Sequence, residues 1–283
     1  MTVLVAERID EFDYHGYRLE YTEYGSGDRV VVLLHGQLMP RRMHEPLARA
    51  LAAAGHHVYT LDLLGHGRSD KPSDPALYSM TAFGHQVVAL LDHLDVEDAV
   101  VGGTSLGANT TLEVAARAPE RLRGMIIEMP VLDNAVEAGI IAFAPLLFVA
   151  RAVPIAVTAV RRAAQAVPRS LVPFWSGIAL DTFSQEPDAM AAAIHGIFYG
   201  RVAPPRHERI RIATPALVIG HPHDPVHPAA DAAMLADELL SCRFVEARSI
   251  VEWRRRPDRL NAEALDFLRT CWDADDLDAA VDA

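Results

Sequence analysis

Short apolar runs alternate with longer amphipathic segments along most of the chain. Val30–Leu34 is entirely apolar, as expected for a strand buried on both faces of a sheet. Between residues 81 and 94, by contrast, apolar side chains recur at helical spacing. The same reasoning predicts further strands at 18–24, 57–62, 99–102, 125–127, 216–219 and 243–246, and further helices at 45–54, 106–117, 228–240 and 259–272. Strand–helix alternation of this kind predicts an α/β protein with a doubly wound, mostly parallel sheet.

The alternation stops between residues 130 and 213, where no convincing strand is found. Residues 136–172 are largely apolar and are interrupted by Pro145, Pro154, Pro168 and Pro173, which predicts several helices. We therefore expect a core formed by residues 1–130 and 214–272, with a helical cap inserted at 131–213. Residues 273–283 carry five aspartates and are expected to form an acidic, disordered tail.

Charge and composition narrow the class of protein. A net charge of −12 argues against a nucleic-acid partner, which needs clustered cationic surface. Cys242 and Cys271 are expected to be free thiols in a reducing compartment. The acidic N-terminal residues 1–14 do not resemble a signal peptide. The longest uncharged run of the inserted region, 138–150, has 13 residues, whereas a membrane span needs about 20. We therefore expect a cytoplasmic protein without a membrane span.

The segment Gly103-Thr104-Ser105-Leu106-Gly107 has the G-x-S-x-G pattern of a nucleophile elbow. It follows an apolar strand and precedes a helix, which is the structural context that this motif needs. A sharp turn there would push the serine hydroxyl clear of the sheet edge. The free N–H groups of the following helix would favour a developing oxyanion. Ser105 is therefore the predicted nucleophile.

Together with three further motifs, the elbow resembles the α/β-hydrolase family, and the resemblance runs from about residue 18 to residue 268. The other motifs are Leu33-Leu34-His35-Gly36-Gln37, the stretch 62–70, and Leu217-Val218-Ile219-Gly220 followed by Asp224. The resemblance implies an eight-stranded sheet, Ser105 as the nucleophile, Asp224 as the acid, and the N–H groups of Gln37 and Leu106 as the oxyanion hole. Because residue 105 is serine, the resemblance argues against the haloalkane dehalogenase and epoxide hydrolase subfamilies, which use an aspartate at this position.

The chain departs from the family at the catalytic base. The family histidine follows the last strand, but here Ser249-Ile250 occupy that place, and the last histidine of the chain is His227. Glu252 lies nearby but would be a poor base unless burial raised its pKa. Three alternatives stay open: His227 held by Asp224, with at most about 10 Å between them; Glu128 with His195 from the cap; or no base at all.

The other histidines do not predict a cofactor. His221, His223 and His227 lie close to Asp224, but their spacing is unlike the common zinc patterns. His35 and His66 match family loop histidines and are interpreted as structural. No phosphate-binding glycine-rich loop is present. We therefore expect neither a metal nor a cofactor.

The sequence thus predicts a serine hydrolase with an atypical or impaired triad, formed by Ser105, Asp224 and His227. It would cleave a carboxylic ester or related acyl bond. A small hydrophobic substrate is expected if the pocket shares the apolar residues of the cap (Ile140, Ile141, Phe143, Leu146, Leu147 and Phe148). A second copy of the chain is also considered as a partner. Two alternatives remain, namely an inactive binding protein and a lyase- or oxygenase-like member of the fold.

Overall fold

The computed structural model describes residues 6–135, 141, 144–145, 148 and 152–281. Its core is one eight-stranded sheet with the order β1-β2-β4-β3-β5-β6-β7-β8. The strands are β1 (Glu7–Tyr14), β2 (Tyr17–Tyr24), β3 (Val30–Leu34), β4 (His57–Leu61), β5 (Ala99–Thr104), β6 (Leu122–Glu128), β7 (Ala216–Gly220) and β8 (Cys242–Glu246). Strands β1 and β2 are antiparallel to their neighbours, and all remaining pairs are parallel. The predicted fold class is therefore confirmed.

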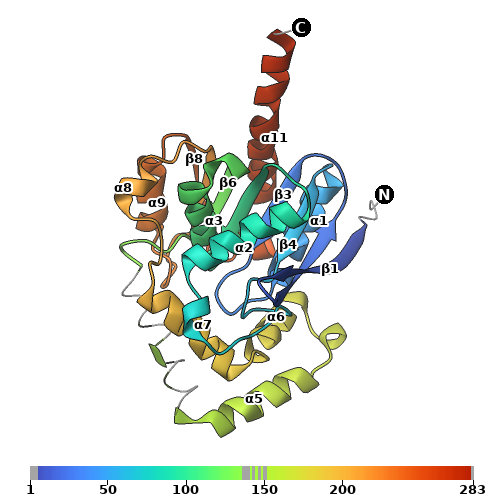
Figure 1. The fold of residues 1–283 in the computed structure, drawn as a ribbon, viewed down its shortest axis with the longest axis vertical. Helices are drawn as coiled ribbons and strands as arrows, with labels where there is room; N and C mark the ends of the chain where they lie inside the picture. Colours follow the sequence, from blue (N-terminus) through green and yellow to red (C-terminus); the bar gives the residue numbers. More distant parts are fainter. Residues whose placement is uncertain (1–5, 136–140, 142–143, 146–147, 149–151, 282–283) are drawn as a thin grey trace.

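Helices cover both faces of the sheet (Figure 1). The described α-helices are α1 (Glu45–Ala53), α2 (Met80–His93), α3 (Leu106–Arg117), α5 (Pro154–Ala166), α6 (Phe174–Phe183), α7 (Pro187–Tyr199), α8 (Arg206–Arg209), α9 (Ala229–Glu238), α10 (Glu252–Arg255) and α11 (Asp258–Val281). Short 3-10 helices occupy Arg41–His44, Pro75–Leu77, Pro119–Arg121 and Arg169–Leu171. None of the helices in the described part of the chain has the length and apolar character that a bilayer span needs.

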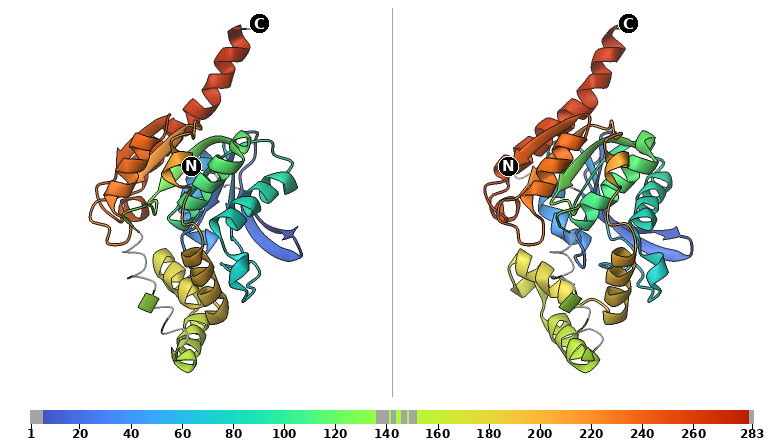
Figure 2. Two further views of the ribbon diagram at one scale, coloured as in Figure 1. Left: turned by 60° about the vertical axis from the view of Figure 1, so that its left-hand side comes forward. Right: turned by 90° about the vertical axis from the view of Figure 1, so that its left-hand side faces the viewer.

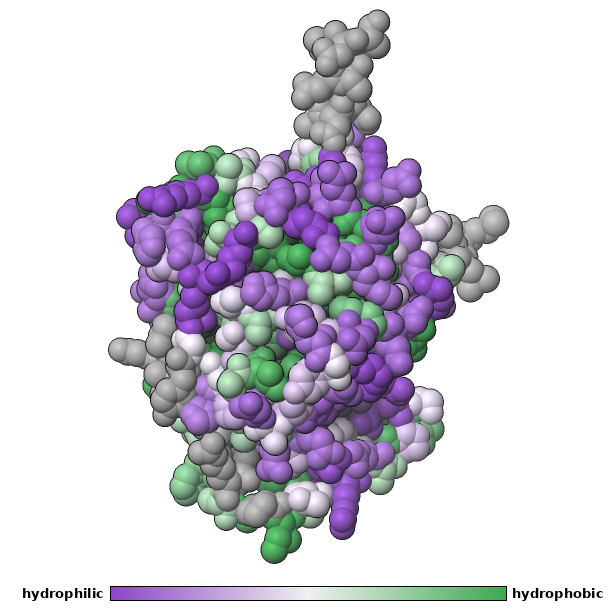
Figure 3. Space-filling view, viewed as in Figure 1, coloured by the Kyte–Doolittle hydropathy of each residue, from purple (hydrophilic) through white to green (hydrophobic). Residues whose placement is uncertain are grey.

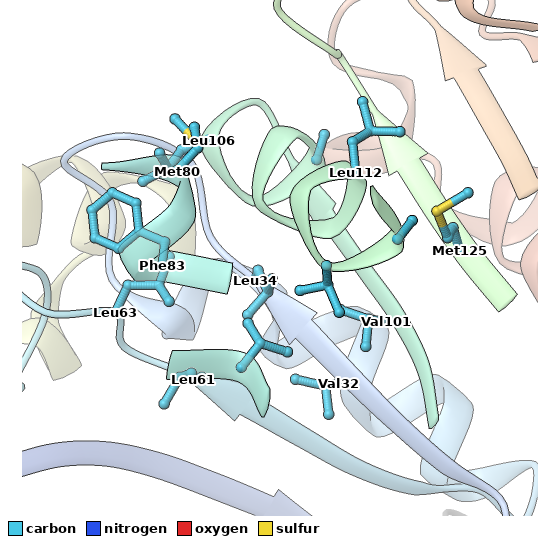
Figure 4. Packing of buried hydrophobic residues seen from close by; sticks show 14 of the residues in the cluster. Val32, Leu34, Leu61, Leu63, Met80, Phe83, Val101, Leu106, Leu112 and Met125 are labelled. Atoms are coloured by element: carbon cyan, nitrogen blue, oxygen red, sulfur yellow. The ribbon is translucent and has the colours of Figure 1, made fainter. Parts of the chain in front are cut away.

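The core lies in two layers, one on each side of the sheet. On one side, helices α2, α3 and α9 pack against the sheet through side chains such as Phe83, Leu112 and Leu235. Figure 4 shows this layer around Leu34 and Val101, with Leu106 and Met80 at its edge. On the other side, α1 and α11 bury Leu51 and Phe267 among the others. Burial on both faces explains why the central strands are uniformly apolar.

Strand β1 was absent from the strands predicted by the hydrophobic pattern. Its sequence is rich in charged residues, and of its eight residues only Phe12 is buried. It pairs along its full length with β2 at the edge of the sheet, where one side of the strand stays exposed to water. An edge strand therefore needs few apolar residues, and its pattern is a weak signal.

The region between β6 and β7 contains helices joined by turns and loops and, among its described residues, no strand. We call residues 131–213 the helical insertion. It lies at one end of the sheet in both views of Figure 2. Asn109, near the start of α3, binds the insertion at two places. The amide nitrogen of Asn109 donates to the carbonyls of Val131 (2.7 Å) and Val202 (2.8 Å). The buried carboxylate of Asp231 accepts N–H groups from Leu132, Asn134 and Ala135.

The structure differs from two expectations, one for the apolar residues of the insertion and one for the acidic C-terminal segment. Ile141 and Phe148 of the apolar set proposed for the pocket are 74% and 71% exposed, whereas Ile140, Phe143, Leu146 and Leu147 lie outside the described residues. Apolar side chains gather at the lower end of the face in Figure 3, over the insertion.

The expected disordered tail at 273–283 is instead helical as far as Val281 (Figure 1). Alanine and leucine between the aspartates favour a helix there, and neither Gly nor Pro ends it.

Candidate active site

The elbow predicted at Ser105 is present between β5 and α3. Ser105 has a φ of 56° and a ψ of −108°, a conformation that costs about 1–3 kcal/mol for a residue other than glycine. Two backbone hydrogen bonds hold it there: its N–H donates to the carbonyl of Glu128 at 2.9 Å, and its carbonyl accepts from the N–H of Asn109 at 3.0 Å. The strained backbone conformation of Ser105 is therefore stabilised by hydrogen bonds to strand β6 and to helix α3.

The glycines of the motif are required by close backbone packing. A Cβ atom at Gly103 would lie 2.7 Å from the carbonyl oxygen of Leu34, and one at Gly107 would lie 2.2 Å from the same atom. Neither distance is tolerable, so only glycine lets α3 begin directly against the end of β3. The close packing is what brings the loop after β3 next to the nucleophile.

The side chains of Ser105, His227 and Asp224 form a continuous hydrogen-bonded chain. His227 Nε2 lies 2.9 Å from Ser105 Oγ, and His227 Nδ1 lies 3.0 Å from Asp224 Oδ2. The second carboxylate oxygen of Asp224 accepts the N–H groups of Val226 (2.8 Å) and His227 (3.0 Å). These two bonds form an Asx-type turn, so the loop after β7 is folded around the carboxylate and presents the ring to the serine.

This arrangement keeps Asp224 ionised. Burial alone would raise its pKa, but hydrogen bonds from the His227 ring and from the two N–H groups outweigh burial and hold the pKa of Asp224 below its usual value. A carboxylate at His227 Nδ1 fixes the neutral ring with its proton on that nitrogen. The other nitrogen, Nε2, is then an acceptor facing the serine hydroxyl.

The two N–H groups predicted for the oxyanion hole have no protein acceptor among the described residues. Within the described part of the chain, no acceptor is bonded to the N–H of Gln37 or of Leu106. The loop that carries Gln37 lies against the nucleophile, since a Cβ atom at Gly36 would be 3.9 Å from the Cβ of Ser105. The side-chain amide of Gln37 is also buried without a partner. The loop after β3 and the start of α3 therefore each bring a backbone donor without a protein acceptor close to Ser105, as an oxyanion hole requires.

The place of the family histidine, after β8, holds no base. Ser249 contributes its carbonyl oxygen, which lies 3.0 Å from His221 Nδ1. Glu252 is bound by Arg259, and this hydrogen bond lowers the pKa of Glu252 to about 2. Arg254 projects from α10 toward the elbow, with its guanidinium 3.3 Å from Thr104 Oγ1.

Glu128, the acid of the second alternative, belongs to a buried charged cluster beside the elbow. Its carboxylate accepts hydrogen bonds from His221 Nε2 (3.0 Å), Arg254 (2.6 Å) and Thr104 Oγ1 (2.5 Å). Burial would raise the pKa of Glu128, but Arg254 and then His221 hold it well below its usual value. Burial would lower the pKa of His221, yet Glu128 raises it overall. The sequence hinted at Glu128 but not at His221 and Arg254, which lie 93 and 126 residues away from it.

His35 and His66 have the structural surroundings that the sequence predicted. His35 Nδ1 lies 2.8 Å from the carbonyl of Gly36, and its Nε2 accepts the N–H of Leu63 at 3.1 Å. Burial lowers the pKa of both histidines, to about 3 for His66. His35 is thus a neutral ring that joins the loops after β3 and β4.

The three histidines near Asp224 do not converge on one site. His221 faces Glu128, His227 faces Ser105, and His223 is exposed. Among the described residues, no three His, Cys, Asp or Glu side chains come together in a way that could hold a metal ion.

A serine at a strained elbow, on a sheet of this order, defines the α/β-hydrolase class of fold. A family model for the alpha/beta hydrolase fold matches residues 29–152. The chain is 32% identical over 124 residues to a haloalkane dehalogenase of Mycolicibacterium paratuberculosis, covering 44% of this chain and 41% of that protein. It is 27% identical over 234 residues to 3-oxoadipate enol-lactonase 2 of Acinetobacter baylyi, covering 78% and 82% of the two chains. The crystal structure of the enol-lactonase from Burkholderia xenovorans matches with a TM-score of 0.76 at 25% identity, covering 92% of this chain and 99% of that one.

These matches show that the chain has the α/β-hydrolase fold. The match to the dehalogenase is confined to part of the sequence, since the chain spans about two fifths of that protein's length. The matches to the enol-lactonases extend over most of both chains.

Proposed function

We propose that this protein hydrolyses a carboxylic ester or a related acyl bond with Ser105 as the nucleophile. The observation that carries the proposal is the 2.9 Å separation between Ser105 Oγ and His227 Nε2, within hydrogen-bond reach of a general base. Asp224 orients the imidazole from its other nitrogen. The histidine thus comes from the loop after β7, which also supplies the acid, and replaces the family residue after β8.

The proposed reaction has two half-reactions. Ser105 Oγ attacks the carbonyl carbon while its proton passes to His227 Nε2, and the oxyanion is held by the N–H groups of Gln37 and Leu106. Collapse of the tetrahedral species breaks the bond to the leaving group, which takes the proton from His227. Water then attacks the acyl-serine, its proton again passing to His227, and the carboxylic acid is released with the serine restored.

Two further observations favour acyl chemistry over carbon–halogen or epoxide cleavage. Residue 105 is a serine, whereas those chemistries are expected to use a carboxylate at this position. Two relatives that match over most of their length are named as enol-lactonases, and a lactone is a cyclic ester. The size and polarity of the substrate stay open, because Ile141 and Phe148 are exposed to solvent.

Covalent labelling tests this function directly. A fluorophosphonate probe followed by mass spectrometry should modify Ser105 in the wild-type protein and not in Ser105→Ala. His227→Gln should slow both labelling and the hydrolysis of p-nitrophenyl butyrate by about 10²–10⁴-fold. His223→Gln, a histidine from the same loop that is exposed, is the matched control and should leave both rates unchanged. A folded wild-type protein with no label on Ser105 between pH 6 and 9 would overturn the proposal.

A further inference from the structure

A cavity of about 640 Å³ lies between the helical insertion and the core, apart from the elbow. On the core side its walls come from β1, β2, the loops after β3 and β4, and the start of α1. On the insertion side they come from α5, the 3-10 helix Arg169–Leu171, α6 and the turn after α6. Ser105, His227 and Asp224 are not among its lining residues. Its volume falls within the range of about 300–1,000 Å³ that is usual for small-molecule sites.

The carboxylates that line this cavity are all paired with arginine. Asp62 is bound by Arg41, Asp181 by Arg42 and Arg169, and Glu186 by Arg161. The remaining two, Glu7 and Glu45, are both bound by Arg49. The acidic groups in the wall are therefore already neutralised, which leaves the unpaired cations to set the local charge.

Two cations of the lining lack an acidic partner. The guanidinium of Arg68 has no hydrogen bond or ion pair with any described residue, although its backbone N–H is bonded to Asp62. The Lys71 ammonium donates only to the carbonyls of Gly67 (2.5 Å) and Ser69 (2.8 Å). One of its three N–H groups thus stays available. Asp62, Glu186 and Asp70 act on Lys71 from a distance and would raise its pKa, but burial outweighs them and lowers it, so an anion bound directly to the ammonium would be favourable.

The insertion supplies an unpartnered acceptor to the same cavity. Gln185, between α6 and α7, lines it and is only 8% exposed, and its Oε1 atom is buried without a hydrogen bond. A buried amide oxygen left without a donor costs about 1–3 kcal/mol. A ligand that fills the cavity could supply the missing donor. The cavity therefore presents cations from the core and an acceptor from the insertion.

We propose that this cavity is a second binding site, for a small anion that carries a carboxylate or a phosphate together with a hydroxyl or amide N–H group. The anion binds Arg68 and Lys71 of the core, and its donor group satisfies Gln185 Oε1 of the insertion. A ligand held on both sides joins the insertion to the core. The site is independent of acyl chemistry at Ser105.

Calorimetric titration of the full chain tests the site with three probes: citrate, tricarballylate and inorganic phosphate, each compared with sodium chloride at equal ionic strength. Arg68→Ala and Lys71→Met should each weaken binding about tenfold or more, because each removes a charge-assisted hydrogen bond. Arg162→Ala is the matched control, since Arg162 is exposed on α5 and does not line the cavity. Ser105→Ala should bind as the wild type does, which separates this site from the proposed function.

The choice of probes resolves the chemistry of the ligand. Citrate and tricarballylate differ only in a hydroxyl group, so the wild type should prefer citrate and Gln185→Leu should bind the two equally. Tighter binding of phosphate than of citrate would assign a phosphorylated ligand, and the reverse would assign a carboxylate. The proposal is overturned if none of the three probes binds saturably at millimolar concentration. It is equally overturned if Arg162→Ala weakens binding as much as Arg68→Ala does.

Discussion

Two carboxylate–imidazole pairs lie on either side of the elbow, and they differ in what the second ring nitrogen faces. In the pair Asp224–His227, the free nitrogen faces the hydroxyl of Ser105 at 2.9 Å. In the pair Glu128–His221, it faces the carbonyl oxygen of Ser249 at 3.0 Å. The first ring is partly exposed, with 16% of the side chain accessible, and the second is fully buried.

The chemical consequence follows from the donors and acceptors. A carbonyl oxygen and a carboxylate are both acceptors, so both nitrogens of His221 must carry protons, in agreement with its raised pKa. An imidazolium of that kind cannot take a proton from a serine. A hydroxyl can donate as well as accept, so His227 Nε2 is free to act as a base. The same two residue types thus build a structural ion pair in one place and a proposed proton shuttle in the other.

The largest expected effect comes from breaking the pair at the serine. Asp224→Asn removes the charge that stabilises the imidazolium and favours the wrong tautomer of His227, so kcat for p-nitrophenyl butyrate should fall by about 10⁴-fold, as for the buried acid of other serine hydrolases. Asp237→Asn, at an exposed position on α9, is the control and should keep wild-type kcat. If Asp224→Asn turns over like the wild type, the two pairs do not differ in the way described.

The buried pair should respond in stability. Glu128→Ala leaves the charges of Arg254 and His221 without their carboxylate, which costs about 3–5 kcal/mol for a buried ion pair. Urea denaturation measures this loss. Asp98→Ala, which breaks the more exposed pair with Arg123, should cost at most about 1 kcal/mol. Equal losses in the two variants would mean that the Glu128 cluster is not structural in the sense argued above.

The sequence predicted the sheet and the elbow because both depend on local signals. The short apolar run Val30–Leu34, rich in valine, favours a buried strand, and the glycines around Ser105 mark a turn where a Cβ atom would clash. The sequence made His227 a candidate base, but it gave no reason to pair His221 with Glu128. Both lie within three residues of Asp224, and only the direction of each ring, set by the fold of the loop after β7, decides which one meets the serine.

The cluster around Glu128 could not be predicted from the sequence for a related reason. Its members come from β5, the end of β6, the residue after β7, and α10, and no local pattern connects them. The sequence made Glu252 a poor base unless burial raised its pKa, but it gave no reason to expect Arg254 to contact the buried Glu128. Which distant charges meet is set by the order of the strands in the sheet. The hydrophobic pattern predicts the fold class but not these contacts.

A smaller effect is expected from the hydroxyl next to the nucleophile. Thr104 Oγ1 donates to Glu128 at 2.5 Å, so Thr104→Val should lower the free energy of unfolding by about 1.5–3 kcal/mol, the range for a hydrogen bond to a charged group. Thr104→Ser keeps the hydroxyl and is the matched control in urea denaturation. A valine variant as stable as the serine variant would show that this hydroxyl does not support the cluster.

The smallest expected effect is the pH dependence of the buried pair. The pKa of His221 is raised in the folded state, with Glu128 and Arg254 as the charged groups facing it. Its stabilising contribution is therefore fully present below the unfolded pKa of about 6.5, and is lost as the pH rises through the folded value. Urea denaturation at each pH should show the free energy of unfolding falling more steeply from pH 6 to pH 9 in the wild type than in His221→Gln. Parallel curves for the wild type and His221→Gln would remove the claim that His221 is held as an imidazolium, and with it the electrostatic distinction between the two pairs.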